Sequence, residues 1–263
     1  MRRTLLTVAV SAGVLVWTPA GADTRTRCGD GNICNATIEG NISKADVLAF
    51  QKLAKKVASN PPSTQALIVT LNSKGGDVRA AIEIGQIVRR IPKSAAVVAR
   101  DDICASACVF VLAGAVLRSV SGKVAIHRPY SMTTEEKKYQ DRQREFSALS
   151  RAAKDYLEQM NVPLALYDEM MQIPPQAIKV LSDAELQRFG LDRNDPVYQD
   201  LLDSDIARSY GLSKTDYLSR KARAFQICQK VNAPAPKTLE NARQAYELEQ
   251  QCTVEVMNGT RNN

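Results

Sequence analysis

Ser106 and His127 are the two residues of this sequence whose types and positions best fit covalent chemistry. A serine hydroxyl is a poor nucleophile until a neighbouring base accepts its proton, and imidazole titrates in the useful range. His127 is the only histidine and ends an apolar, strand-like segment at residues 123–127. Ser106 follows a second such segment, residues 94–99. The pair therefore predicts a nucleophile and its general base.

Two successive glycines, Gly75 and Gly76, follow a third apolar segment at residues 66–71. Glycines let the backbone approach a reacting group closely, and fixed N–H groups stabilise the negative charge that acyl transfer places on a carbonyl oxygen. Asp77 is well placed to cap a following helix, whose dipole adds to this effect. Each feature alone is ordinary, whereas their combination predicts an oxyanion-binding turn at residues 72–76.

The elements that must position these residues alternate between strand and helix patterns. Residues 66–71 have the continuous apolar pattern of a strand buried on both faces. Helices are predicted at residues 77–91 and 105–114, between the three strands. This βαβ order predicts an α/β fold with a largely parallel sheet covered by helices. Ligand sites in such sheets lie at the carboxyl ends of the strands, where the candidate residues stand.

The rest of the chain is predicted to form helices and loops. A short loop is expected between Cys28 and Cys34, and helical patterns occupy residues 45–58, 133–160, 163–173 and 182–190. Beyond Pro196 the segments are polar and helical, without strand candidates. We therefore expect an α/β domain at residues 23–195 and a helical C-terminal extension at residues 196–263.

Residues 1–22 have the layout of a secretory signal peptide: two arginines, a short apolar run and the small residues Ala20, Gly21 and Ala22. The run is shorter than the roughly 20 residues that span a bilayer, which disfavours an uncleaved anchor. We expect cleavage near Ala22, a periplasmic or secreted product, and no membrane span in the mature chain.

Six cysteines fit an oxidising compartment better than a metal site. An even count with an export signal favours disulfides, and structural zinc needs four ligands in a chain that has one histidine. No metal or cofactor is expected. Cys104 and Cys108 bracket Ser106; they either rigidify its turn, report redox state or are merely two small buried residues. Proximity suggests three pairs: Cys28–Cys34, Cys104–Cys108 and Cys228–Cys252.

The formal net charge of +7 comes from charges scattered in mixed clusters. The sequence has no basic tract interleaved with aromatic residues, so we expect no nucleic-acid partner.

Three short motifs resemble the Clp protease proteolytic subunit and its crotonase-like relatives. Residues 71–77 (LNSKGGD) resemble the family's Asn-Ser-x-Gly-Gly turn, and Ile126-His127-Arg128-Pro129 resembles its Ile-His-x-Pro segment. Ala105-Ser106-Ala107 is similar to its nucleophile segment. The resemblance covers roughly residues 66–191 and is closest to exported Clp-like proteins. It implies a fold of repeated ββα and βαβ units.

Carried over residue by residue, the resemblance makes Ser106 the nucleophile, His127 the base, and Gly75 and Gly76 the oxyanion turn. The N–H group of Ala107 could supply a second donor. The family's catalytic aspartate is expected about three residues before Leu181, where this chain has no acid. The third member could instead be one of three shifted carboxylates, or the site could be a Ser–His dyad. The three candidates are Asp168, Glu169 and Asp183.

Two classes of function remain in contention. The first is an exported serine peptidase that cleaves short or unfolded peptides, or membrane-protein fragments, through an acyl-enzyme. We find no Gly-rich phosphate loop, so no ATP-driven partner is expected. The second is a non-catalytic scaffold or peptide-binding protein, because in serine proteases disabling the acid can cost about 10⁴ in turnover.

A third and weaker alternative is acyl-CoA chemistry, which would leave the Ser–His pair unexplained and requires a cytoplasmic cofactor. The resemblance also implies assembly into rings or stacked trimers through the helix after the histidine strand. The helix predicted at residues 133–160 could make this chain a homo-oligomer.

Overall fold

The computed structural model describes residues 23–29, 33–61, 65–130, 139–228 and 238–261. The predicted signal peptide at residues 1–22 lies outside these ranges, as does the start of the helix predicted at residues 133–160. In the described part, no helix is both long enough and apolar enough to cross a membrane.

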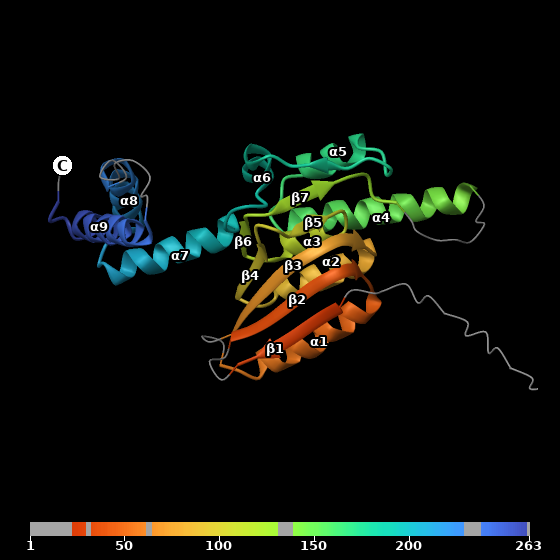
Figure 1. The fold of residues 1–263 in the computed structure, drawn as a ribbon, viewed down its shortest axis with the longest axis horizontal. Helices are drawn as coiled ribbons and strands as arrows, with labels where there is room; N and C mark the ends of the chain where they lie inside the picture. Colours follow the sequence, from red (N-terminus) through yellow and green to blue (C-terminus); the bar gives the residue numbers. More distant parts are fainter. Residues whose placement is uncertain (1–22, 30–32, 62–64, 131–138, 229–237, 262–263) are drawn as a thin grey trace, which may run out of the picture.

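The centre of the molecule is one mixed sheet with mostly parallel pairings (Figure 1). Strands run in the order β1-β2-β3-β5-β7-β8, while β4 pairs with β3 and β6. Only the β1–β2 and β7–β8 pairings are antiparallel. The predicted α/β class with a largely parallel sheet is therefore confirmed. The strands are β1 (Asp23–Cys28), β2 (Ile33–Ile42), β3 (Ala66–Gly76), β4 (Lys93–Val98), β5 (Ile103–Ala105), β6 (Leu117–Val120), β7 (Lys123–Ile126) and β8 (Lys179–Val180).

Strand β3 is longer than the sequence predicted and serves two branches of the sheet. Its first half pairs with β4, and at Ser73 it pairs with Cys104 of β5. The tight turn predicted at residues 72–76 is instead strand, because β2 runs alongside it as far as the Ile42–Gly76 pair. The glycines therefore end a strand and lead directly into the next helix.

The helices of the first 190 residues gather largely on one face of β1–β3 (Figure 1). The prediction that β3 is buried on both faces is wrong, because its residues alternate between buried and accessible positions. Ile68 is exposed on the open face, whereas Leu67 and Val69 are fully buried. The helices are α1 (Lys44–Ala58), α2 (Val78–Arg89), α3 (Cys108–Gly114), α4 (Tyr139–Gln159), α5 (Ala165–Gln172) and α6 (Asp183–Phe189).

Helix α3 is buried along its whole length, and α2 crosses it at close range. A Cβ atom at Gly114 would lie 2.6 Å from the Cα atom of Gly85, so only glycine lets these helices approach so closely. The Tyr156 hydroxyl of α4 donates to Phe110 O at 2.6 Å and so holds α4 against α3. Burial raises the pKa of Tyr156.

Arg118 joins the ends of three helices inside the domain. Its guanidinium group donates to Ala113 O, Ala115 O, Met160 O and Gly190 O at 2.6–3.0 Å, so it binds carbonyls at the carboxyl ends of α3, α4 and α6. A cation at helix C-termini is stabilised by the helix dipoles. Burial lowers the pKa of Arg118 to about 10, which still leaves it charged at neutral pH.

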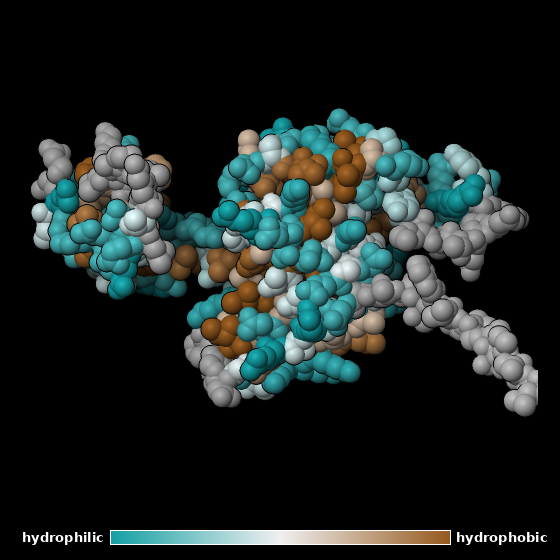
Figure 2. All heavy atoms as spheres, viewed as in Figure 1, coloured by the Kyte–Doolittle hydropathy of each residue, from teal (hydrophilic) through white to brown (hydrophobic). Residues whose placement is uncertain are grey.

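Three helices follow the sheet domain: α7 (Pro196–Ser209), α8 (Lys214–Cys228) and α9 (Leu239–Asn258). Helix α7 leads away from the sheet and carries α8 and α9 at its far end (Figure 1). These helices are mostly hydrophilic on the face shown in Figure 2. Asp195 fixes the start of α7, because its carboxylate caps the helix and bonds Arg89 at 2.8 Å and Asn161 at 2.9 Å.

The three predicted cysteine pairs all lie at bonding distance. Cys28–Cys34 joins β1 to β2, where the sequence had suggested only a loop. Cys228–Cys252 joins α8 to α9. Cys104–Cys108 joins β5 to α3. The helix predicted at residues 105–114 therefore begins only at Cys108, because the preceding residues pair with β7 as strand β5.

Candidate active site

Ser106 and His127 lie just beyond the ends of two adjacent parallel strands. The last ladder pair of β5 and β7 is Ala105–Ala125, and the Ser106 N–H group donates to Ala125 O at 2.9 Å. Ser106 is therefore one residue past this pair and His127 is two residues past it. Both residues line the same cavity. The strand that positions Ser106 is β5 and not the predicted strand at residues 94–99, which is β4 and does not pair with β7.

Ser106 has a backbone conformation that is unfavourable for a residue with a side chain. Its φ is +54°, and Asn161 is the one other non-glycine residue of the described ranges with a positive φ. Such a residue costs about 1–3 kcal/mol, and strained residues cluster at functional sites. A serine on a strained strand-to-helix turn is also how α/β-hydrolases present their nucleophile. The conformation exposes the Ser106 side chain at the cavity.

The Cys104–Cys108 disulfide holds this turn from both sides. Both cysteines are fully buried, and the turn is also bonded through Val109 N to Ser106 O at 3.1 Å. A disulfide that reports redox state is usually exposed or strained. The complete burial of both cysteines therefore favours a disulfide that rigidifies the turn over one that reports redox state.

A backbone carbonyl orients the imidazole of His127. The Nδ1 atom lies 2.9 Å from Arg128 O. A carbonyl oxygen can only accept, so this bond requires the hydrogen on Nδ1 and leaves Nε2 as the basic nitrogen. The bond selects the tautomer that a general base needs.

The carbonyl that binds His127 is itself held by α5. The Arg128 side chain donates twice to Met171 O, at 2.7 and 2.9 Å, and Arg128 N donates to Ile173 O at 2.9 Å. These bonds fix the backbone around residue 128 to the carboxyl end of α5. Tyr130 lies beside the imidazole, with ring centroids 5.7 Å apart.

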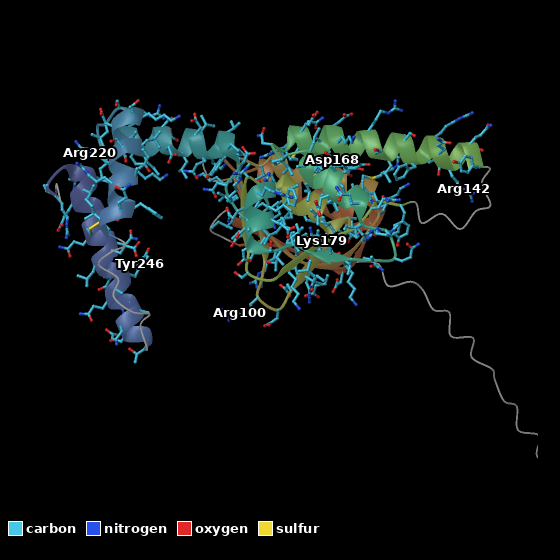
Figure 3. All side chains as sticks on the ribbon, turned by 90° about the horizontal axis from the view of Figure 1, so that it is seen from above. Arg100, Arg142, Asp168, Lys179, Arg220 and Tyr246 are labelled. Atoms are coloured by element: carbon cyan, nitrogen blue, oxygen red, sulfur yellow. A yellow bond between two sulfur atoms is a disulfide. The ribbon has the colours of Figure 1, made fainter. Side chains whose placement is uncertain are left out.

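The three carboxylates considered as a third member do not line the cavity. Asp168 is exposed on α5 and Asp183 is exposed at the start of α6. Glu169 is engaged elsewhere, because Lys179 Nζ lies 2.6 Å from its carboxylate. Figure 3 labels Asp168 and Lys179 on their elements. The structure thus places Ser106 and His127 at one cavity that none of these three acids lines.

The two glycines have different parts in the site. The Gly75 N–H group donates to Ser73 Oγ at 3.1 Å, and that hydroxyl donates to Gly40 O at 2.5 Å. Gly75 is therefore not placed as an oxyanion donor. Its contribution is the missing side chain, since a Cβ atom there would lie 2.7 Å from the Cβ of Ser106 and 3.1 Å from Ala107 N.

Gly76 presents the better donor. Successive N–H groups of a strand point in opposite directions. Asp77 N donates to Ile42 O at 2.9 Å on the β2 side, so the Gly76 N–H group faces away from β2. Gly76 lines the cavity with Ser106 and His127. Ala107 is fully buried and stands immediately before α3. Its backbone N–H group is the candidate for the second donor.

The cavity has a volume of about 650 Å³ and is lined by both apolar and charged residues. The apolar residues come from the end of β2 and from two helices, α2 and α4. The charged residues come from the end of β3, the start of α2 and Glu145 of α4. The apolar residues are Ile42, Val78, Phe146 and Leu149, and the charged residues are Lys74, Asp77, Arg79 and Glu145. A peptide segment would find both apolar and ionic contacts here.

Sequence reasoning missed the contribution of α4. The sequence favours only an assembly role for the helix predicted at residues 133–160, whose first half is highly charged. Phe146 and Leu149 are the signal that was available, since they stand three residues apart among charges and so share one helix face. In the described part of the chain, no group of three or more histidine, cysteine, aspartate or glutamate residues could hold a metal ion.

Comparison with known proteins places the site inside a recognised family segment. The model of the Clp protease family matches residues 51–165. That segment contains Gly75, Gly76, Ser106 and His127 on the α/β framework described above. No curated protein matches the chain.

Two solved structures are similar at 17% sequence identity. One is a mutant of the 1510-N membrane-bound stomatin-specific protease, with a TM-score of 0.45 over 61% of this chain and 76% of that chain. The other is a ClpP1 mutant from Listeria monocytogenes, with a TM-score of 0.42 over 60% of this chain and 88% of that chain.

Proposed function

We propose that this protein is an exported, ATP-independent serine peptidase of the Clp type, with Ser106 as nucleophile and His127 as general base. The observation that carries the proposal is the placement of both residues at adjacent strand ends, opening into one cavity. The positive φ of Ser106 and the Nδ1–H tautomer of His127 support it.

The proposed reaction uses each of these groups in turn. His127 Nε2 accepts the proton of Ser106 as Oγ attacks the peptide carbonyl carbon. The Gly76 N–H group, with Ala107 N–H as second donor, stabilises the oxyanion. The tetrahedral intermediate collapses, the C–N bond breaks, and the imidazolium gives its proton to the leaving amine. Water then attacks the Ser106 ester by the same base catalysis, which releases the acid product and the free enzyme.

The Arg128 carbonyl would take over only part of the task of a catalytic acid. It orients the ring and fixes the tautomer, but a neutral oxygen stabilises the imidazolium less than a carboxylate does. We therefore expect turnover well below that of a serine peptidase with a full triad, while the acylation step remains.

A fluorophosphonate probe tests the proposal at the first covalent step. The wild-type protein should be labelled, and both Ser106→Ala and His127→Ala should lose the label. Ser121→Ala removes an exposed hydroxyl outside the cavity and should be labelled like the wild type. Equal labelling of wild type and Ser106→Ala would overturn the assignment.

The second candidate is a non-catalytic peptide-binding protein with the same cavity. It is favoured by one observation, the absence of Asp168, Glu169 and Asp183 from the cavity lining. It predicts peptide binding that is equal in wild type and Ser106→Ala, without labelling of either.

Export and assembly are further parts of the proposal. N-terminal sequencing of the protein recovered from outside the cytoplasm should start near Asp23. Helix α4 extends well past the sheet, and Arg142 is labelled near its far end (Figures 1 and 3). A helix that extends in this way could join copies of the chain, so we expect a molar mass by light scattering that is a multiple of the monomer.

A further inference from the structure

Two cations stand at the cavity next to the proposed oxyanion donor. Lys74 precedes the glycine pair at the end of β3, and Arg79 lies in the first turn of α2. Both residues are exposed and both line the cavity with Ser106 and His127. They thus flank Gly76, whose N–H group would face the carbonyl of the bond to be cleaved.

The carboxylate closest to the two cations in sequence already accepts hydrogen bonds from backbone N–H groups. Asp77 caps α2 and accepts from Arg79 N at 2.8 Å and from Ala80 N at 3.1 Å. Among the described residues, neither the Lys74 ammonium nor the Arg79 guanidinium forms an ion pair with a carboxylate. Asp77 and Glu145 also line the cavity, so its lining is not net positive; Lys74 and Arg79 instead offer two cationic groups that are outside any ion pair with the described carboxylates.

The cavity also has apolar lining residues. They are Ile42 and Val78, with Phe146 and Leu149 from α4. A peptide bound across Ser106 would place an apolar side chain against these residues and a neighbouring group against the two cations. Because the cations lie beside the oxyanion donor, the group they meet belongs to a residue close to the cleaved bond.

We propose that Lys74 and Arg79 select peptides that carry a carboxylate next to the cleaved bond, beside an apolar residue. This inference rests on the proposed peptidase function and names its substrate class. The carboxylate is either an acidic side chain or the free C-terminus of a short peptide, since both present the same group to a lysine and an arginine.

Peptide hydrolysis distinguishes these sources. A fluorogenic peptide series holds the apolar residue constant and places Glu, Gln or Lys beside it, and a second series compares a free C-terminus with its amide. For wild type we expect kcat/KM to be about three- to tenfold higher for the carboxylate-bearing member of at least one series, the range that one or two exposed ion pairs provide. Added salt should reduce this preference.

Two variants test the cations directly. Lys74→Ala/Arg79→Ala should bring the ratio of Glu to Gln peptides close to one, and Lys74→Glu/Arg79→Glu should favour the Lys peptide. Lys52→Ala/Arg100→Ala is the charge-matched control, because it removes two exposed cations outside the cavity; Arg100 is labelled on its loop in Figure 3. The control should keep the wild-type ratio. Circular dichroism melting verifies that all variants fold.

A binding measurement separates this inference from the proposed function. Fluorescence anisotropy of labelled Glu and Gln peptides is measured on Ser106→Ala, which cannot form the acyl-enzyme. Tighter binding of the carboxylate peptides, lost in the Lys74→Ala/Arg79→Ala background, would support the inference even if no hydrolysis were detected. Hydrolysis or binding without any carboxylate preference in wild type would overturn it and leave the peptidase proposal intact.

Discussion

Gly75 lies against Ser106 so closely that a Cβ atom on the glycine would be 2.7 Å from the serine Cβ. The same atom would lie 3.0 Å from Ala105 O, and the Gly75 φ of +112° is a conformation that side chains rarely adopt. The packing of this glycine thus determines where the Ser106 side chain can lie.

Gly75→Ala is therefore expected to displace Ser106 and abolish fluorophosphonate labelling. Backbone strain of about 1–2 kcal/mol should also lower the melting temperature by several degrees. Gly29→Ala is the matched control, because a Cβ atom at Gly29 meets nothing within 4 Å. Normal labelling of Gly75→Ala would show that the turn at Ser106 is more adaptable than its contacts indicate.

Arg128 is expected to act as a positioning residue for His127. Arg128→Ala removes the two bonds to Met171 O and frees the carbonyl that binds His127 Nδ1. Since a misplacement of about 1 Å can cost 10²-fold, we expect kcat to fall about 10- to 100-fold with little change in KM. Arg128→Lys should restore part of kcat. A rise in KM with unchanged kcat would assign Arg128 to substrate binding instead.

The two disulfides at residues 104–108 and 228–252 should have opposite effects on activity and stability. The stabilisation from a cross-link grows with the enclosed loop, and the sequence separations are 4 and 24 residues. Removing Cys228–Cys252 should destabilise the α8–α9 pair by about 3 kcal/mol and leave labelling unchanged. Removing Cys104–Cys108 should cost less stability, about 2 kcal/mol, but slow labelling. Labelling that is insensitive to both changes would contradict the role of the buried disulfide.

Acid stability should depend on the contacts of Glu185 at the start of α6. Hydrogen bonds from Lys179 and then from Ser182 lower the pKa of Glu185 from its usual value of 4.5 to about 2. The ionised form is thus favoured in the folded state, so its contribution is complete above pH 4.5 and is lost as the pH falls towards 2. Glu185→Gln should lower the melting temperature at pH 7, with a difference that shrinks between pH 4.5 and 2.

Asp168→Asn controls for the loss of one negative charge, because it removes an exposed carboxylate from α5. A melting difference for Glu185→Gln that stays constant down to pH 2 would show that the Lys179 contact does not set the acid stability of this region.

The sequence was sufficient for the features that depend on local patterns. Apolar runs predicted β3, β4 and β7, and the order of elements predicted the α/β class. Ser106 and His127 were expected at one edge of a parallel sheet, although the strand that carries Ser106 is the unpredicted β5 and not β4. The capping box of Ser182 and Glu185 likewise follows from residue spacing alone and is present in the structure.

Local sequence patterns could not predict the features that require distant segments of the chain to meet. Strand β1 is polar and largely accessible, so its pairing with β2 leaves no apolar signature. The burial of Arg118 requires three helices to end at one point. The contact of His127 with the Arg128 carbonyl depends on a backbone conformation that α5 imposes. The absence of an acid at the expected position could be noticed in the sequence, but the contact of His127 with a main-chain oxygen could not.

Asp195 sets a limit on how the chain can be shortened. Its carboxylate is a counter-charge for Arg89 and lies 4.0 Å from Arg118, although it stands immediately before the first residue of α7. A truncation that ends at residue 194 would leave both guanidinium groups without that neutralising partner inside the domain. A truncation placed after α7 keeps the partner and discards only the helices beyond it. The end of the sheet-containing part is thus defined by an ion pair, one helix further along than the last strand would suggest.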